Sequence, residues 1–169
     1  MPNRKTLQRA QQDKRDGKSP STQAGEFVRE EIQHVREGKH GARSPEQAIA
    51  IGLSKARRAG IEVRPPASGK TSESTRRKAQ RDHARGHGAP PSRRGGARRS
   101  AATTGVLRRE SHSSASTRAL GAQAHAAASR RSGPERSAAA QQASRTKGRR
   151  VRSAAARKAA RTRAAHRRT

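Results

Sequence analysis

The basic side chains of residues 64–169 are the part of this sequence whose chemistry is most evident. This region carries 28 Lys/Arg against 4 Asp/Glu, a balance of +24, whereas residues 1–63 carry 13 against 8, a balance of +5. Arginine is always charged, and its planar guanidinium group donates two parallel hydrogen bonds to phosphate oxygens. A segment with this charge balance attracts polyanions. The pattern therefore predicts contacts with the phosphate backbone of a nucleic acid.

The predicted phosphate contacts lie in two parts of this basic region and in one loop nearer the N-terminus. If about ten of these cations engage DNA phosphates, the slope of log K against log salt would be about −9. The nucleic-acid-binding residues that we predict are Arg93, Arg94, Arg98, Arg99, Arg149, Arg150, Arg152, Arg157, Lys158, Arg161 and Arg163, together with Lys39 and Arg43 in the loop.

The composition limits how such a protein reads its partner. The chain has one Phe and no Tyr or Trp, whereas sequence-specific RNA recognition and single-strand binding usually stack bases on aromatic rings. We therefore expect nonspecific DNA binding, with compaction or bridging as in a nucleoid-associated, histone-like protein. Two alternatives stay open. One is an RNA- or ribosome-associated basic protein, and the other is an adaptor whose N-terminal helices bind a protein partner.

Catalytic and metal chemistry find no comparable support in the sequence. The chain has no Cys, which excludes thiolate catalysis and cysteine-bound zinc. His83 and His87 are four residues apart but stand in a Gly-rich stretch, and His34 and His40 flank the end of a predicted helix. Neither pair has the pattern of a metal site. We expect no enzyme activity, no cofactor and no metal.

The helices or strands that would position these residues must form in a chain with few apolar side chains. Only 28% of the residues are hydrophobic and the formal net charge is +29. Low hydrophobicity with high net charge is typical of disorder, because too little apolar surface is available to offset chain entropy. The sequence therefore predicts a mostly disordered protein with a small all-α N-terminal part, and residues 64–169 as a disordered Arg/Ala/Ser-rich tail.

Residues 44–60 have the clearest helix pattern in the chain. Ser44 is a good N-cap, Pro45 suits the first helical position, and Gln47 completes a capping box. Gly60 is the residue type expected just after the helix. The pattern predicts a helix over about 45–59, whose apolar stripe consists of Ala48, Ile49, Gly52, Leu53 and Ala56.

A second helix is predicted over about 19–37, between the cap Ser19 and the terminating Gly38. The two helices would form a helical hairpin within a module of residues 19–63. A basic segment, residues 1–18, precedes this module and could contain a short helix. Such a core is too small to be very stable alone, so we expect either marginal stability or a homodimer in which two hairpins form a four-helix unit. The residues expected to hold the hairpin are Phe27, Ile32, Ile49 and Leu53.

The strings GKSPSTQAGEFVREEI at 17–32 and QAIAIGLSKARRAG at 47–60 resemble a module of small basic bacterial proteins of unknown function. The resemblance implies a bacterial source and transfers no activity. The tail is similar in composition to linker-histone and bacterial histone-like tails, which supports DNA binding. No apolar signal segment or run of about 20 apolar residues is present, so we expect a cytoplasmic protein of the nucleoid without membrane association.

Overall fold

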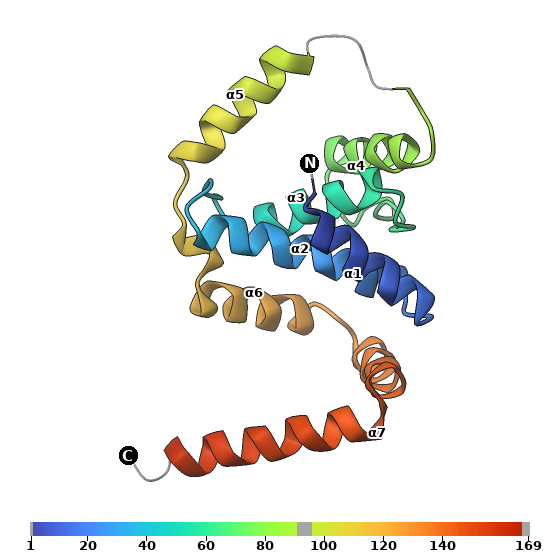
Figure 1. The fold of residues 1–169 in the computed structure, drawn as a ribbon, viewed down its shortest axis with the longest axis vertical. Coiled ribbons are helices and arrows are strands. Elements are labelled where there is room, and N and C mark those ends of the chain that lie inside the picture. The colour runs from blue at the N-terminus through green and yellow to red at the C-terminus, as the bar shows by residue number, and fades with distance from the viewer. Residues whose placement is uncertain (1, 91–95, 167–169) are drawn as a thin grey trace. The chain divides into compact units, whose positions relative to one another are not determined.

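The protein is almost entirely helical (Figure 1). The computed structural model describes residues 2–90 and 96–166, apart from the side chains of 96–99, 146–147, 149–150 and 166. Within these ranges the elements are α1 (Arg4–Arg15), α2 (Pro20–Arg36), α3 (Pro45–Arg58), α4 (Glu73–Gly86), α5 (Gly96–Arg109), the 3-10 helix η1 (Ser113–Ala115), α6 (Thr117–Ser129) and α7 (Gly133–His166).

The prediction that the chain is mostly intrinsically disordered, with a small helical part, is wrong. Helices account for 74% of the chain, and α4, α5, α6 and α7 all lie in the region predicted to be a disordered tail. The physical reason is local. Alanine and arginine have high intrinsic helix propensity. Low hydrophobicity and high net charge indicate that a segment cannot build an apolar core, but they do not prevent it from forming helices.

Polar caps define the starts of these additional helices. Ser72 accepts a hydrogen bond from the backbone N–H of Thr75 at 3.3 Å before α4. Before α7, the backbone N–H of Ser132 donates to Glu135 Oε2 at 2.8 Å, while the N–H of Glu135 donates to Ser132 Oγ at 3.4 Å. This reciprocal pair is a capping box, which satisfies two otherwise unpaired backbone donors.

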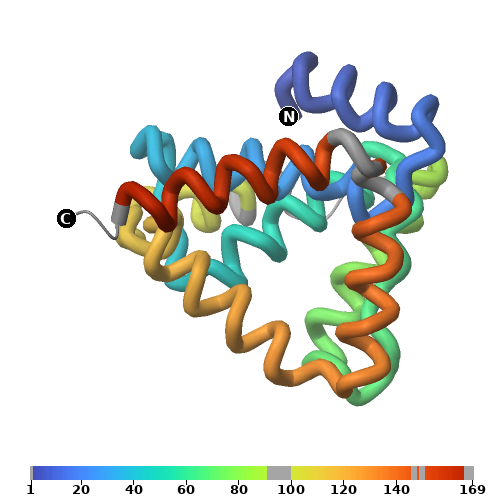
Figure 2. The backbone as a smooth tube through the Cα atoms, turned by 90° about the horizontal axis from the view of Figure 1, so that it is seen from below, coloured from blue at the N-terminus to red at the C-terminus, as the bar shows by residue number. Residues whose placement is uncertain are grey.

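The chain divides into two compact units, Met1–Gln123 and Ala124–Thr169. In the N-terminal unit, α2 and α3 pack against each other and cross at an angle (Figures 1 and 2). Their backbones approach so closely that a Cβ placed on Gly52 would lie 2.6 Å from the Cα of Val28. A glycine is therefore required in α3 at this crossing.

Two clusters of buried apolar residues form the core of the N-terminal unit. The first surrounds Phe27 and joins α1, α2, α3 and the segment after α3. The second surrounds Val35 and joins α2, the following loop, α3 and η1. Since α1 and η1 supply buried side chains, the hairpin core is larger than the two-helix core that favoured a dimer. The buried members are Ala10, Ala24, Phe27, Ala56 and Ile61 in the first cluster, and Val35, Ala42, Ala48 and Ala115 in the second.

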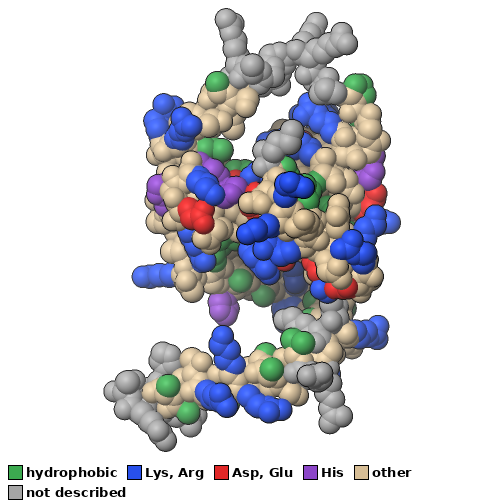
Figure 3. Space-filling model, viewed as in Figure 1, with side chains coloured by type: hydrophobic (Ala, Val, Ile, Leu, Met, Phe, Trp, Pro, Cys, Tyr) green, Lys and Arg blue, Asp and Glu red, His purple; other side chains and the backbone are tan. Residues whose placement is uncertain are grey.

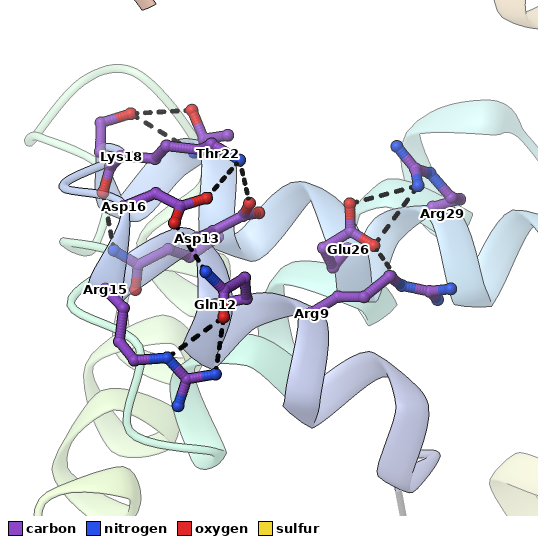
Figure 4. Close-up of polar contacts among 11 residues, drawn as sticks. Arg9, Gln12, Asp13, Arg15, Asp16, Lys18, Thr22, Glu26 and Arg29 are labelled. Atoms are coloured by element: carbon purple, nitrogen blue, oxygen red, sulfur yellow. Dashed lines mark hydrogen bonds and ion pairs between the residues drawn. The ribbon is translucent and has the colours of Figure 1, made fainter.

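Ion pairs lie between α1 and α2, within α2 and at the turn between the two helices (Figure 4). Arg9 Nε lies 2.6 Å from Glu26 Oε2, and Arg29 Nη1 lies 3.3 Å from Glu26 Oε1. At the turn between the helices, Lys18 Nζ lies 2.6 Å from Asp13 Oδ1 and 3.2 Å from Asp16 Oδ2. The predicted basic N-terminal segment thus contains a helix, and Arg9 and Lys18 of this segment are paired with carboxylates.

A distant part of the chain returns to the loop between α2 and α3. The N–H of Gly41 donates to the carbonyl of Leu107 at 2.8 Å, and the N–H of Ala42 donates to the carbonyl of Ser111 at 3.0 Å. Arg36 Nε also donates to the carbonyl of Ala115 at 2.8 Å. Residues 107–115 therefore complete the N-terminal unit, although they lie in the region predicted to be a tail.

The C-terminal unit is dominated by α7, none of whose described side chains is buried. The helix contains a break at Gly148, where φ is 61° and ψ is 164°. Figure 2 shows the two stretches of α7 running in different directions on either side of this break. Because a positive φ favours glycine, Gly148 is the residue that permits the bend.

Candidate nucleic-acid interface

The second stretch of α7 carries five of the predicted contact residues with exposed side chains. None of the five forms an ion pair with another described residue. No acidic residue follows Glu135 in the sequence, so these cations have no carboxylate close to them along the chain. The five residues are Arg152, Arg157, Lys158, Arg161 and Arg163.

These cations surround the helix instead of forming one stripe. Successive residues of an α-helix are rotated by about 100°, so Arg157 and Arg161 lie on one face and Lys158 lies beside them. Arg152 and Arg163 are eleven residues apart and project from nearly the opposite face. A helix charged on all sides cannot bury a face against an apolar core. The same arrangement lets it contact phosphates on more than one side.

The other predicted residues of the basic region cannot be compared in the same way. Arg98 and Arg99 lie in α5, and Arg149 and Arg150 lie in α7, but their side chains are outside the part that the structure describes. The predicted contacts Arg93 and Arg94 fall entirely outside the described residues.

The loop residues Lys39 and Arg43 differ from the α7 cations. Both are exposed, but Lys39 Nζ lies 2.9 Å from Glu37 Oε2. Hydrogen bonds from Lys39 and then Gln33 hold the pKa of Glu37 below its ordinary value, so this carboxylate stays charged beside Lys39. The backbone N–H of Arg43 donates to Gln47 Oε1 at 2.7 Å. Lys39 is therefore a weaker candidate for phosphate contact than the α7 cations, whereas the exposed side chain of Arg43 forms no ion pair with another described residue.

A buried polar cluster in the N-terminal unit was not predicted from the sequence. The side chain of Glu31 is only 1% exposed and forms an ion pair with Lys55 of α3. Its other oxygen lies 3.0 Å from His40 Nε2. Burial lowers the pKa of the neighbouring His34, and the charges of Lys55 and Lys39 act in the same direction. The cluster neutralises a charge inside the unit and joins α2 to α3.

Glu30 and Glu26 are buried as well, although the predicted apolar face of α2 did not include them. Glu30 Oε1 accepts a hydrogen bond from the backbone N–H of Asn3 at 3.0 Å, while Glu26 is paired with Arg9 of α1. The sequence signal for this burial is weak, because it depends on donors supplied by α1 and not on the spacing within α2.

The surface is rich in basic groups. On the face shown in Figure 3, Lys and Arg side chains clearly outnumber those of Asp and Glu. Among the described residues, no helix is both long enough and apolar enough to cross a bilayer.

Comparison of the chain with protein-family models, curated proteins and solved structures gives no match. The function must therefore be argued from the residues and their arrangement alone.

Proposed function

We propose that this protein binds duplex DNA without sequence preference through the exposed cations of α7, and that it compacts or bridges DNA in this way. The observation that supports the proposal is the set of five exposed Lys and Arg side chains of α7 that make no ion pair within the described chain. Cations of this kind release counterions from DNA when they neutralise phosphates, which drives binding.

The shape of the element favours duplex DNA over duplex RNA. The major groove of B-DNA is about 12 Å wide and admits an α-helix, whereas the major groove of A-form RNA is too narrow for side chains to enter. A helix with cations on all sides, such as the stretch of α7 around Arg157, can reach phosphates on both walls of a groove. Contacts of this type position a protein on DNA but carry no sequence information.

The test compares two full-length variants that remove the same charge from different helices. The first is Arg157→Gln/Lys158→Gln/Arg161→Gln in α7. The control is Arg4→Gln/Lys5→Gln/Lys14→Gln in α1, whose three side chains are also exposed. Binding to a duplex of about 30 base pairs is measured by fluorescence anisotropy over a series of salt concentrations.

We expect the α7 variant to reduce the magnitude of the salt slope by about 2.7, because each lost phosphate contact removes about 0.9. The α1 variant should leave the slope close to that of the unchanged protein. Equal reductions in both variants would refute a localised interface. If the protein instead binds a structured RNA of the same length more tightly, its partner is RNA and not DNA.

A further inference from the structure

The C-terminal end of α4 brings two histidines and a glutamate together. His87 Nε2 lies 3.1 Å from Glu62 Oε1, and His83 Nε2 lies 3.4 Å from Glu62 Oε2. The two imidazole rings lie side by side, with their centroids 4.4 Å apart. One ligand atom from each of the three residues falls within 4.8 Å of the others. Both histidines therefore present the same ring nitrogen to one carboxylate.

The packing of α4 on α3 fixes this arrangement. A Cβ placed on Gly86 would lie 1.9 Å from the carbonyl oxygen of Arg57 and 2.9 Å from the backbone nitrogen of Gly60. The end of α4 thus rests directly on the end of α3, next to the segment that carries Glu62. One turn earlier, the buried Asp82 accepts a hydrogen bond from Ser54 Oγ. His83 lies in α4 and His87 directly follows it, so the packing of α4 on α3 places both histidines beside the segment that carries Glu62.

The distances suit a tetrahedral metal ion. Zn²⁺ binds imidazole nitrogens and carboxylate oxygens at about 2.0–2.2 Å, so neighbouring ligand atoms of a tetrahedron lie about 3.4 Å apart. The two histidine nitrogens lie near this distance from the Glu62 carboxylate, each from a different oxygen, so rotation of the exposed Glu62 side chain could bring one oxygen to an ion held by both histidines. His83 and His87 also lie at the C-terminal end of a helix, where the helix dipole favours a cation.

We propose that Glu62, His83 and His87 form a binding site for a divalent transition metal of the Zn²⁺, Co²⁺ or Ni²⁺ class. The two imidazole nitrogens favour these ions, because Mg²⁺ and Ca²⁺ prefer sites made of oxygen ligands. The site is partly exposed, so an ion can enter from solvent and water can complete its coordination. Bound metal would clamp α4 to the segment after α3.

The buried cluster of Glu31, His34 and His40 is a poorer candidate, although its ligand atoms also lie within 4.8 Å of one another. The ammonium group of Lys55 already pairs with Glu31 and occupies the place that a metal cation would need. This cluster serves as the internal comparison for the test.

The experiment is calorimetric titration of the tag-free, full-length protein with Zn²⁺, followed by titration with Co²⁺ monitored by visible absorption. We expect one Zn²⁺ per chain, an absorption spectrum typical of tetrahedral Co²⁺, and a higher unfolding temperature with metal. His83→Gln, His87→Gln and Glu62→Gln should each weaken binding at least tenfold. His125→Gln, at an exposed position of α6, should bind as the unchanged protein does.

Circular dichroism of each variant establishes that it is folded before titration. The proposal is overturned if Zn²⁺ does not bind at one equivalent, or if the three variants bind it as tightly as His125→Gln does. It is also overturned if His40→Gln, and not His87→Gln, abolishes binding, since the ion would then occupy the buried cluster.

Discussion

Single buried polar residues decide how the helices of the N-terminal unit fit together. Glu31 and Asp82 are almost completely buried, and each is satisfied by a residue of α3: Lys55 in the first case and Ser54 in the second. Glu31 and Lys55 form a buried ion pair, and losing one partner of such a pair costs about 3–5 kcal/mol. These pairings determine which faces of the helices meet. Apolar contacts made largely by alanine would determine the helix faces less precisely.

His34 makes the stability of the N-terminal unit depend on pH. Burial, and then the charges of Lys55 and Lys39, lower its pKa in the folded protein, while Glu30 and Glu31 oppose the shift more weakly. The folded state therefore binds fewer protons than the unfolded state as the pH falls below the ordinary histidine value of about 6.5. Stability is highest above that value and is lost as the pH falls toward the lowered pKa.

The measurement is the urea midpoint of the unchanged protein and of His34→Gln at pH 7.5 and pH 5.5. Between these values we expect the unchanged protein to lose more stability than the variant does. The two proteins differ only at position 34, so the difference between their pH dependences isolates His34. Parallel pH dependences would show that His34 contributes nothing.

The positions of helices could be predicted from the sequence wherever a capping residue and an apolar pattern agreed. The expected caps Ser19 and Ser44 accept backbone hydrogen bonds at the starts of α2 and α3, and Gly60 follows α3 with φ of 80°. The helices of residues 64–169 were missed because disorder was inferred from overall charge. The capping box of Ser132 and Glu135 was a local signal for α7 that the composition obscured.

The core and the candidate metal site were harder to foresee. Three of the nine residues of the two core clusters lie in the apolar pattern of α2, and two more, Ala48 and Ala56, lie in the predicted apolar stripe of α3, but the clusters also use Ala10, Ala42 and Ala115. Alanine gives no periodic signal in a chain where it is abundant. Likewise, the pair His83 and His87 was visible, but its partner Glu62 is brought to it only by the packing of α4 on α3.

The crossing of α2 and α3 depends on Gly52. A Cβ at this position would lie 2.6 Å from the Cα and 2.9 Å from the backbone nitrogen of Val28, so Gly52→Ala must push the two helices apart. We expect it to lower the free energy of unfolding by about 1–3 kcal/mol, as overpacking does.

Gly25→Ala is the matched control, because Gly25 lies in α2 with nothing within 4 Å of its Cβ position. There the better helix propensity of alanine should raise stability by up to about 1 kcal/mol. Chemical denaturation measures both variants. Equal effects of the two substitutions would contradict the close approach of the helices.

At the scale of the whole chain, charge is managed differently in different regions. The N-terminal unit pairs many of its cations internally, as Arg9, Lys18 and Lys55 illustrate. The exposed cations of α7 have no such partners among the described residues. Salt should therefore weaken the proposed binding to DNA far more than it weakens the fold of the N-terminal unit.

The return of residues 107–115 to the loop after α2 joins distant parts of the sequence. A Cβ on Gly41 would lie 1.8 Å from the carbonyl oxygen of Glu110. Gly41→Ala should therefore break the hydrogen bonds that the loop donates to Leu107 and Ser111, each worth about 1 kcal/mol. We expect faster hydrogen exchange at the Gly41 position and at Ala42, together with lower overall stability.

Gly105→Ala in α5 is the control for this variant, since nothing lies within 4 Å of its Cβ position. It should leave the exchange of Ala42 unchanged. Unaltered protection of Ala42 in Gly41→Ala would mean that residues 107–111 do not rest on this loop in solution.

The same return sets the order in which the protein can mature on the ribosome. Val35, Ala42 and Ala48 are synthesised long before Ala115, the residue that covers them in the finished unit. Until that residue emerges, the nascent chain carries an uncovered apolar patch, a state that is prone to aggregation. The entropy cost of closing the intervening loop grows only slowly with its length. The late synthesis of Ala115 therefore delays folding of the unit but has little effect on the stability of the folded unit. A chain that stops after α3 would keep this patch exposed.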